Sequence, residues 1–210
     1  MTAFSALYDR LMPQLPGCTT PLVDQVILTV ARDFCTKSRY WRADCDAVDL
    51  VADQAAYALD PPGTGAEVCQ VLRLTVSDTV LYDVGWNADS PTDEPKYRLT
   101  EPPFSLSVDL ATLTLIDDEI PSAAVTDGME VLAALRPTTT AATLPDFFGG
   151  EQREALCAGV LANLMLMGKK PWTDRDMAMA FDSKYTAATH AAATLAANGY
   201  TRRPLRTRKW

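Results

Sequence analysis

The chain has 210 residues, of which 48% are apolar and 22% are charged, and its formal net charge is −8. This length and composition predict a globular protein with one good-sized core, or with a core and a subdomain. The charge argues against nonspecific adhesion of the body to DNA, which requires clustered Lys and Arg. No segment approaches the roughly 20 apolar residues of a membrane span. We expect no signal peptide, because Asp9 and Arg10 interrupt the apolar pattern of residues 1–15.

The first 46 residues predict a hairpin of two helices, joined at the Pro16-Gly17 break. Before the break, apolar residues recur at helical spacing: Phe4, Leu7, Tyr8 and Leu11. After it, Thr20 and Pro21 form a typical helix start, and we expect this helix to end near Trp41. Its apolar stripe consists of Val23, Val26, Ile27, Val30 and Phe34.

From residue 47 to residue 136 the apolar pattern has a period of two, which is typical of antiparallel strands. The alternating residues include Val48, Leu50, Leu72, Leu74, Val76, Leu113, Leu115, Met129, Val131, Ala133 and Leu135. Ser77 and Asp78 look like a turn between two strands. The stretch 85–103 holds four prolines and several acids, and it predicts a protruding loop or a loosely ordered hairpin. We therefore expect a β-rich insertion subdomain over residues 47–136.

Helical spacing returns in residues 137–199 and predicts two C-terminal helices that complete a bundle. The first is apolar on more than one side, so either its own core or a neighbouring subunit must bury it. Its candidate subunit-interface residues are Leu156, Val160, Leu161, Leu164 and Met165. Thr173 and Asp176 resemble a capping box at the start of the last helix, and Asn198-Gly199 is a natural end.

Together these segments predict an α+β fold. We expect a mainly α-helical bundle, made of two N-terminal and two C-terminal helices, with a central antiparallel β-rich insertion and an extended C-terminal tail, residues 200–210. The last ten residues contain five Lys and Arg and no acid, whereas the first 200 hold all 27 acids and 14 Lys and Arg. The first 200 residues thus have a net charge of −13 and the last ten a net charge of +5. This division of charge indicates a tail that binds another component. Pro204 interrupts any continuing helix, and Leu205 and Trp210 add apolar anchors.

The sequence predicts no catalytic residue, no metal site and no cofactor. The single histidine, His190, has no carboxylate or cysteine near it at helical spacing. Two acidic groups fit solvated turns better than a magnesium or calcium loop: Asp117-Asp118-Glu119, and Asp44, Asp46, Asp49 and Asp53. Five scattered cysteines suit reduced, buried thiols: Cys18, Cys35, Cys45, Cys69 and Cys157.

Several motifs, taken in chain order, resemble the head-to-tail adaptor proteins of tailed bacteriophages. They begin at Pro16-Gly17-Cys18 and end with Asn198-Gly199-Tyr200 and the Arg-rich tail, so the resemblance spans nearly the whole chain. Between them lie Arg32–Cys35 with Arg39–Arg42, Asp53–Leu59, Leu144–Phe148 and Gly168–Trp172. Two parts depart from the family pattern: Gly149-Gly150, where relatives often keep a continuous helix, and the acidic loop 85–103.

The resemblance implies a structural virion protein without enzymatic activity, found at the neck of the virion and in the host cytoplasm during assembly. Identical subunits, typically about twelve, would form a ring beneath the portal and continue the DNA channel. The β-rich insertion would face tail or nozzle proteins, and genomic DNA would pass without sequence-specific binding. The C-terminal segment would dock on the portal through Tyr200, Arg202, Arg203, Leu205, Arg206, Arg208, Lys209 and Trp210.

Two other functions stay open at this point. The tail could bind nucleic acid, with its cations on phosphates and Trp210 stacked on a base. The acidic body disfavours this, because it repels phosphate outside the tail. A metal-dependent hydrolase could use Asp117, Asp118 and Glu119, but no distant carboxylate is evidently paired with them.

Overall fold

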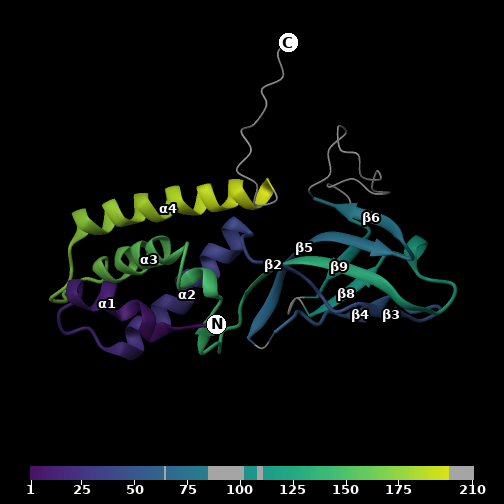
Figure 1. The fold of residues 1–210 in the computed structure, drawn as a ribbon, viewed down its shortest axis with the longest axis horizontal. Coiled ribbons are helices and arrows are strands. Elements are labelled where there is room, and N and C mark those ends of the chain that lie inside the picture. The colour runs from purple at the N-terminus through teal and green to yellow at the C-terminus, as the bar shows by residue number, and fades with distance from the viewer. Residues whose placement is uncertain (64, 85–101, 108–110, 199–210) are drawn as a thin grey trace, which may run out of the picture. The chain divides into compact units, whose positions relative to one another are not determined.

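The computed structural model describes residues 1–63, 65–84, 102–107 and 111–198, and Figure 1 shows its elements. The chain divides into two compact units. The helical unit comprises Met1–Tyr40 and Thr139–Trp210, and the β unit comprises Trp41–Thr138. The tail 200–210, and the acidic loop 85–103 except for Pro102 and Pro103, lie outside the described residues. Within the described ranges, no helix has both the length and the apolar character needed to cross a membrane.

Three long helices form the body of the helical unit: α2 (Thr20–Ser38), α3 (Arg153–Met165) and α4 (Arg175–Ala197). α3 packs against both α2 and α4, which is why most of its circumference is apolar (Figure 1). α2 ends before the position expected near Trp41, because Arg39 adopts a left-handed conformation with φ of 50°. Ser38 reinforces this end by donating a hydrogen bond from its hydroxyl to the Phe34 carbonyl.

The N-terminal segment, for which a short helix was expected, folds into several shorter elements. Its elements are β1 (Thr2–Ala3), η1 (Phe4–Leu7), α1 (Tyr8–Leu11) and η2 (Met12–Gln14). Pro13 in η2 lacks a backbone N–H, so a helix cannot continue through it. Leu7, Leu11 and Leu15 are nevertheless buried, and this burial explains their helix-like spacing. Before α3, β10 (Thr143–Leu144) pairs with β1, and η4 (Asp146–Phe148) follows.

The described residues of the β unit form two antiparallel sheets. The five-stranded sheet has the order β2 (Arg42–Asp44), β9 (Val125–Pro137), β5 (Ala66–Val76) and β6 (Thr79–Asp83), and β3 (Val48–Leu50) also pairs with β9. The three-stranded sheet has the order β4 (Ala56–Ala58), β8 (Thr112–Leu115) and β7 (Phe104–Leu106). A short helix, η3 (Asp117–Glu119), follows β8.

The apolar faces of these two sheets share one core. Leu74 and Met129 from the larger sheet and Leu113 from the smaller one are completely buried in the same cluster. Tyr82 of β6 and Phe104 of β7 meet edge to face, with 5.4 Å between their ring centroids. The β unit therefore has the interior of an independent domain.

The expected fold class, a mainly α-helical bundle with a central β-rich insertion, is wrong. The chain is α+β and has four α-helices among its described residues, but its described strands form three antiparallel sheets and are not a small insertion in a helical bundle. Two causes account for the error. The first expected helix is a single α-turn, and β5 and β9 reach 11 and 13 residues where short runs were expected. Strands of that length bury enough apolar surface to build a core of their own.

Candidate interaction surface on the β unit

The sequence predicts two sets of binding residues, and only one of them lies among the described residues. The portal-binding set, Tyr200 to Trp210, lies outside the described residues, so its role stays a prediction. The five subunit-interface candidates of α3, namely Leu156, Val160, Leu161, Leu164 and Met165, have at most 6% of their surface exposed. Within the single chain, α2 and α4 already bury these five side chains. Almost none of their surface is therefore left for contact with a neighbouring subunit.

Charge is also divided unevenly between the two units. The β unit contains 18 Asp and Glu and 5 Lys and Arg, a net charge of −13. The helical unit without residues 199–210 contains nine acids and nine Lys and Arg, so it is formally neutral. All of the excess negative charge of the body is therefore on the β unit.

Seven of these acids gather where three segments of the β unit meet, a surface that we call the acidic end. Its members are Asp49, Asp53, Asp78, Asp117, Asp118, Glu119 and Asp127. Backbone hydrogen bonds join the segments. The Asp53 N–H donates to the Pro121 carbonyl at 2.9 Å, and the Ser77 N–H donates to the Gly128 carbonyl at 2.8 Å. The segments 48–54, 76–79 and 116–128 contain no Lys or Arg, so no basic side chain within them neutralises the acids.

Backbone geometry explains why several of these positions are Asp. Asp53, Asp78 and Asp127 have positive φ values of 61°, 62° and 50°, a region that Asp tolerates better than most residues. Ser77 and Asp78 form the two-residue turn between β5 and β6, as expected from the sequence. Asp49 accepts a hydrogen bond from the Asp127 N–H at 2.8 Å. Asp117 and Asp118 do not have a positive φ, so turn geometry of this kind does not account for them.

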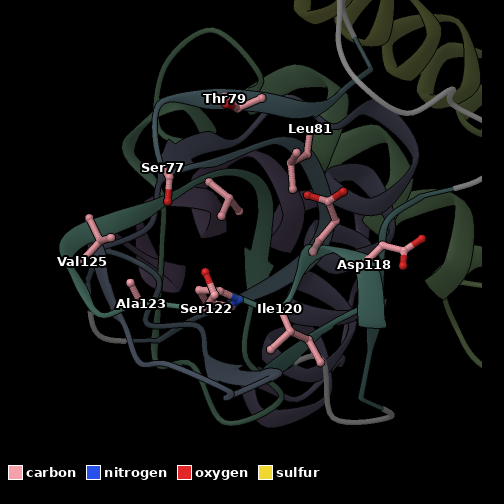
Figure 2. Close-up of a pocket in the computed structure, with 11 residues that line it drawn as sticks. Ser77, Thr79, Leu81, Asp118, Ile120, Ser122, Ala123 and Val125 are labelled. Carbon is pink, nitrogen blue, oxygen red and sulfur yellow. The ribbon is translucent and has the colours of Figure 1, made fainter.

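A groove of about 330 Å³ opens at the acidic end, and Figure 2 shows its lining, which includes two of the seven acids, Asp118 and Glu119. The groove walls come from the β5–β6 hairpin on one side and from residues 118–125 on the other. Its apolar lining consists of Val76, Leu81, Ile120, Pro121, Ala123 and Val125. Its polar lining consists of Ser77, Thr79, Asp118, Glu119 and Ser122. In Figure 2, Asp118 lies across the hollow from Ala123 and Val125. A groove with an apolar lining and acidic edges suits a cationic segment that also carries apolar side chains.

Three exposed apolar side chains extend this surface, and they are not among the residues predicted from the sequence. Val51, Ile116 and Val125 are 48%, 38% and 39% exposed. Ile116 was detectable in principle, because it directly follows β8 and is out of phase with the buried Leu113 and Leu115 of that strand. Val51 is likewise out of phase with Leu50. Their gathering beside the acids depends on strand pairing that the sequence does not reveal.

A second acidic group of the β unit lies around the buried Cys45. Burial raises the pKa of the Cys45 thiol to about 11, and the nearby carboxylates of Asp44, Asp46 and Asp60 add to this effect. Asp44 pairs with Leu132 of β9, seven residues along the strand from Val125. This group therefore lies apart from the acidic end on the same unit.

The other residues considered for chemistry lie elsewhere. His190 lines a pocket of about 340 Å³ in the helical unit, together with Lys37, Tyr185, Thr186 and Thr189. The Tyr185 hydroxyl donates a hydrogen bond to Asp33 Oδ2 at 2.9 Å, and Lys37 Nζ lies 2.8 Å from the same oxygen. Burial and this carboxylate raise the pKa of Tyr185, so its hydroxyl stays a neutral donor. Among the described residues, no three His, Cys, Asp or Glu side chains are grouped so that they could hold a metal ion.

No protein-family model matches the chain, and a search of curated proteins finds no match either.

Proposed function

We propose that this protein is a structural virion subunit that forms a ring between the portal and the tail of a bacteriophage. The ring, of about twelve copies, continues the DNA channel, and the C-terminal tail of each subunit docks on the portal. The proposal comes from the resemblance of motifs spread along the chain, and the charge distribution supports it.

The observation that carries the proposal is the separation of charge into three parts. The β unit has a net charge of −13, the described part of the helical unit is neutral, and the last ten residues carry +5. A connector has to hold one partner firmly while DNA slides past it. Acidic surfaces repel phosphate, so the β unit suits a position near the DNA path or against a cationic tail protein. The cationic tail suits the opposite task, because repeated weak docking around a ring gives a strong attachment.

The exposed apolar residues of the helical unit suggest where neighbouring subunits meet. Leu166, Met177 and Met179 are 56%, 44% and 70% exposed, and they lie at the end of α3 and the start of α4. Met177 and Met179 are two residues apart on α4, so they point to different sides of the helix and do not form one patch. In a ring, each would meet a different part of the next subunit.

Removal of the tail tests this function directly. We expect a protein lacking Thr201–Trp210 to keep the far-UV circular dichroism and melting temperature of the full chain but to lose attachment to DNA-filled heads in electron micrographs. As a matched control, Arg202, Arg203, Arg206 and Arg208 are replaced together by Lys, which keeps the charge. A truncated protein that joins heads normally would refute the docking role.

Measurements of DNA binding separate this function from nucleic-acid binding. If the tail serves DNA binding, the isolated protein binds duplex DNA strongly at low salt, and replacement of the four arginines by Ala abolishes the binding. For a connector we expect head attachment, and not DNA affinity, to be the property that follows the tail sequence. Calorimetry with Mg²⁺ and Mn²⁺ tests the hydrolase alternative, for which binding of either ion near Asp117 and Asp118 would be required.

A further inference from the structure

We propose that the groove of the acidic end binds an extended segment of another protein in which Lys or Arg residues alternate with apolar residues. The proposed function does not say what the β unit binds, so this inference goes beyond it. Every residue on which the inference rests belongs to the β unit, and the inference therefore does not depend on the ring or on residues 200–210.

The walls of the groove are fixed by the fold of the β unit. The Asp53 N–H donates to the Pro121 carbonyl at 2.9 Å and holds one wall. The Ser77 N–H donates to the Gly128 carbonyl at 2.8 Å and holds the other. Leu81, which also lines the groove, is 2% exposed and belongs to the core cluster of the β unit. Because the fold already fixes these walls, a ligand would lose little of its binding free energy in shaping the site.

The polar chemistry of the groove selects a cation. Asp118 and Glu119 contribute carboxylates to its lining, and Ser77, Thr79 and Ser122 contribute hydroxyls. The segments 48–54, 76–79 and 116–128 contain no Lys or Arg, and the whole β unit has a net charge of −13. Over about 8–10 Å at physiological salt, this surface attracts Lys and Arg and repels phosphates and carboxylates. The charge thus favours a cationic partner over nucleic acid or an acidic peptide.

The apolar surface around the groove requires a partner that is more than a small cation. Val51, Ile116 and Val125 are 48%, 38% and 39% exposed, and among the described residues of the β unit no other large apolar side chain is exposed. Val125 lines the groove and pairs in the sheet with Leu50, the residue before Val51. The exposed apolar surface therefore continues from the groove towards the end of β3. A small amine would leave this surface in water, whereas a peptide with apolar side chains would cover it.

The arrangement of the two kinds of surface predicts the pattern of the partner. Figure 2 shows Asp118 across the hollow from Ala123 and Val125. Successive side chains of an extended peptide point to opposite sides. A segment that lies between the walls therefore directs alternate side chains towards Asp118 and towards Val125. Lys or Arg suits the first set of positions and apolar residues suit the second, as in other grooves that bind extended peptides.

Three fluorescein-labelled peptides of nine residues test this pattern on the full-length protein at 50 mM NaCl. In the first peptide, Lys alternates with Leu. The second has the same composition with all Lys at one end, and the third has Ser in place of every Leu. By fluorescence anisotropy, we expect the first peptide to bind about tenfold more tightly than the third and about threefold more tightly than the second. Equal affinity for the first and third peptides would show attraction by charge alone and would overturn the proposal.

Variants of the protein test the position of the site. The groove variant carries Asp118→Asn and Glu119→Gln, and the matched control carries Asp44→Asn and Asp46→Asn, which removes the same charge from the same unit. We expect the groove variant to bind the first peptide about tenfold more weakly than the native protein, and the control variant at most about twofold more weakly. Val125→Thr keeps the branched shape of the side chain and should weaken binding about threefold. Equal losses in the groove and control variants would contradict a site in the groove.

Amide resonances of the ¹⁵N-labelled full-length protein locate the bound peptide. We expect the first peptide to shift the resonances of residues 76–81 and 118–125, and shifts only outside these segments would refute the proposal. A native protein that self-associates, with a groove variant that does not, would identify a second copy as the occupant instead. Peptide affinity that rises about tenfold on removal of residues 201–210 would identify the chain's own C-terminus instead. None of these measurements involves head attachment, so this inference and the proposed function can fail separately.

Discussion

Gly159 shows at the scale of one residue how the helical unit is packed. It lies within the apolar run of α3, where a helix-weakening residue has no evident reason in the sequence. A Cβ at this position would lie 2.5 Å from Val30 Cγ1 of α2 and 2.8 Å from Tyr185 Cδ2 of α4. The glycine therefore allows three helices to approach each other at one point.

Replacement of Gly159 by Ala should destabilise the protein in spite of the better helix propensity of Ala. We expect the free energy of unfolding to fall by about 1–3 kcal/mol from overpacking, against a propensity gain of at most about 1 kcal/mol. Urea unfolding monitored by circular dichroism measures the difference. Gly168→Ala is the matched control, because a Cβ there meets no atom within 4 Å. Equal effects of the two substitutions would contradict this packing.

Because the pKa of Tyr185 is raised, we expect the stability of the helical unit to depend on pH. Burial, followed by the hydrogen bond to Asp33, raises its pKa in the folded protein above the ordinary value of 10. Folding thus favours the neutral hydroxyl. Its contribution is fully present below pH 10 and is lost as the pH rises from 10 towards the raised folded value. Tyr185→Phe should cost about 1–2 kcal/mol at pH 7 and give a shallower decline of stability between pH 10 and 11. Urea unfolding across this range, with equal declines in both proteins, would refute the assignment.

At the scale of elements, the features that could be predicted are those that depend on nearby residues in the sequence. The start of α2 at Thr20, the burial of Met129, Val131 and Leu135 at period two, and the Ser77-Asp78 turn each depend on neighbours in the sequence. The architecture was not predictable in the same way. Strand pairing joins residues far apart in the chain, for example Leu74 with Val131, and no local pattern encodes it.

The candidate surface illustrates the same limit. Every acid of the acidic end was visible in the sequence, and Asp117, Asp118 and Glu119 were considered together. Asp118, Glu119 and Val125 line one groove together with residues of the β5–β6 hairpin, Ser77 and Thr79, between which Asp78 lies. Only the folded β unit brings these segments together.

The start of α4 is another local feature that differs in detail from its prediction. Thr173 and Asp176 were expected as a capping box, but the N-cap is Asp174, whose carboxylate accepts a hydrogen bond from the Met177 N–H at 3.0 Å. The Thr173 hydroxyl is bound in the preceding turn, where it donates to the Met167 carbonyl. The cap lies one residue later than expected, because Thr173 and Asp174 are both residue types that favour the N-cap position.

The helix cap gives a prediction with a close control. Asp174→Ala should lower the free energy of unfolding by about 1 kcal/mol, since it leaves a helix N–H without its acceptor. Asp176→Ala removes the same charge from the same helical turn and should cost only a few tenths of a kcal/mol. Chemical denaturation of both variants provides the comparison. A larger loss for Asp176→Ala would place the cap where the sequence pattern suggested.

At the scale of the whole molecule, the division into two units makes the charge distribution meaningful. Counting along the chain separates only a tail from a body, whereas the structure assigns the whole acidic excess to residues 41–138. The ends of this unit are tied to its own sheet. The Leu135 N–H donates to the Trp41 carbonyl at 2.8 Å, and the Thr138 N–H donates to the Gly65 carbonyl at 2.9 Å. A segment closed in this way, with one shared core, has the properties of an autonomous domain.

We therefore expect residues 41–138, produced as a separate protein, to fold and to unfold cooperatively. The fragment has a net charge of −13, so its acidic side chains repel one another, and salt screens this repulsion. Its free energy of unfolding should therefore rise by on the order of 1 kcal/mol between 20 mM and 500 mM NaCl. Thermal unfolding and dispersed amide resonances measure folding, and NaCl is used because sulfate stabilises proteins by other means.

The Asp78→Asn, Asp117→Asn, Asp118→Asn fragment should gain less from salt, since part of the repulsion is already removed. An unfolded fragment would show that the core of the β unit depends on the helical unit, and an equal salt response in both fragments would show that the acidic end does not strain the fold.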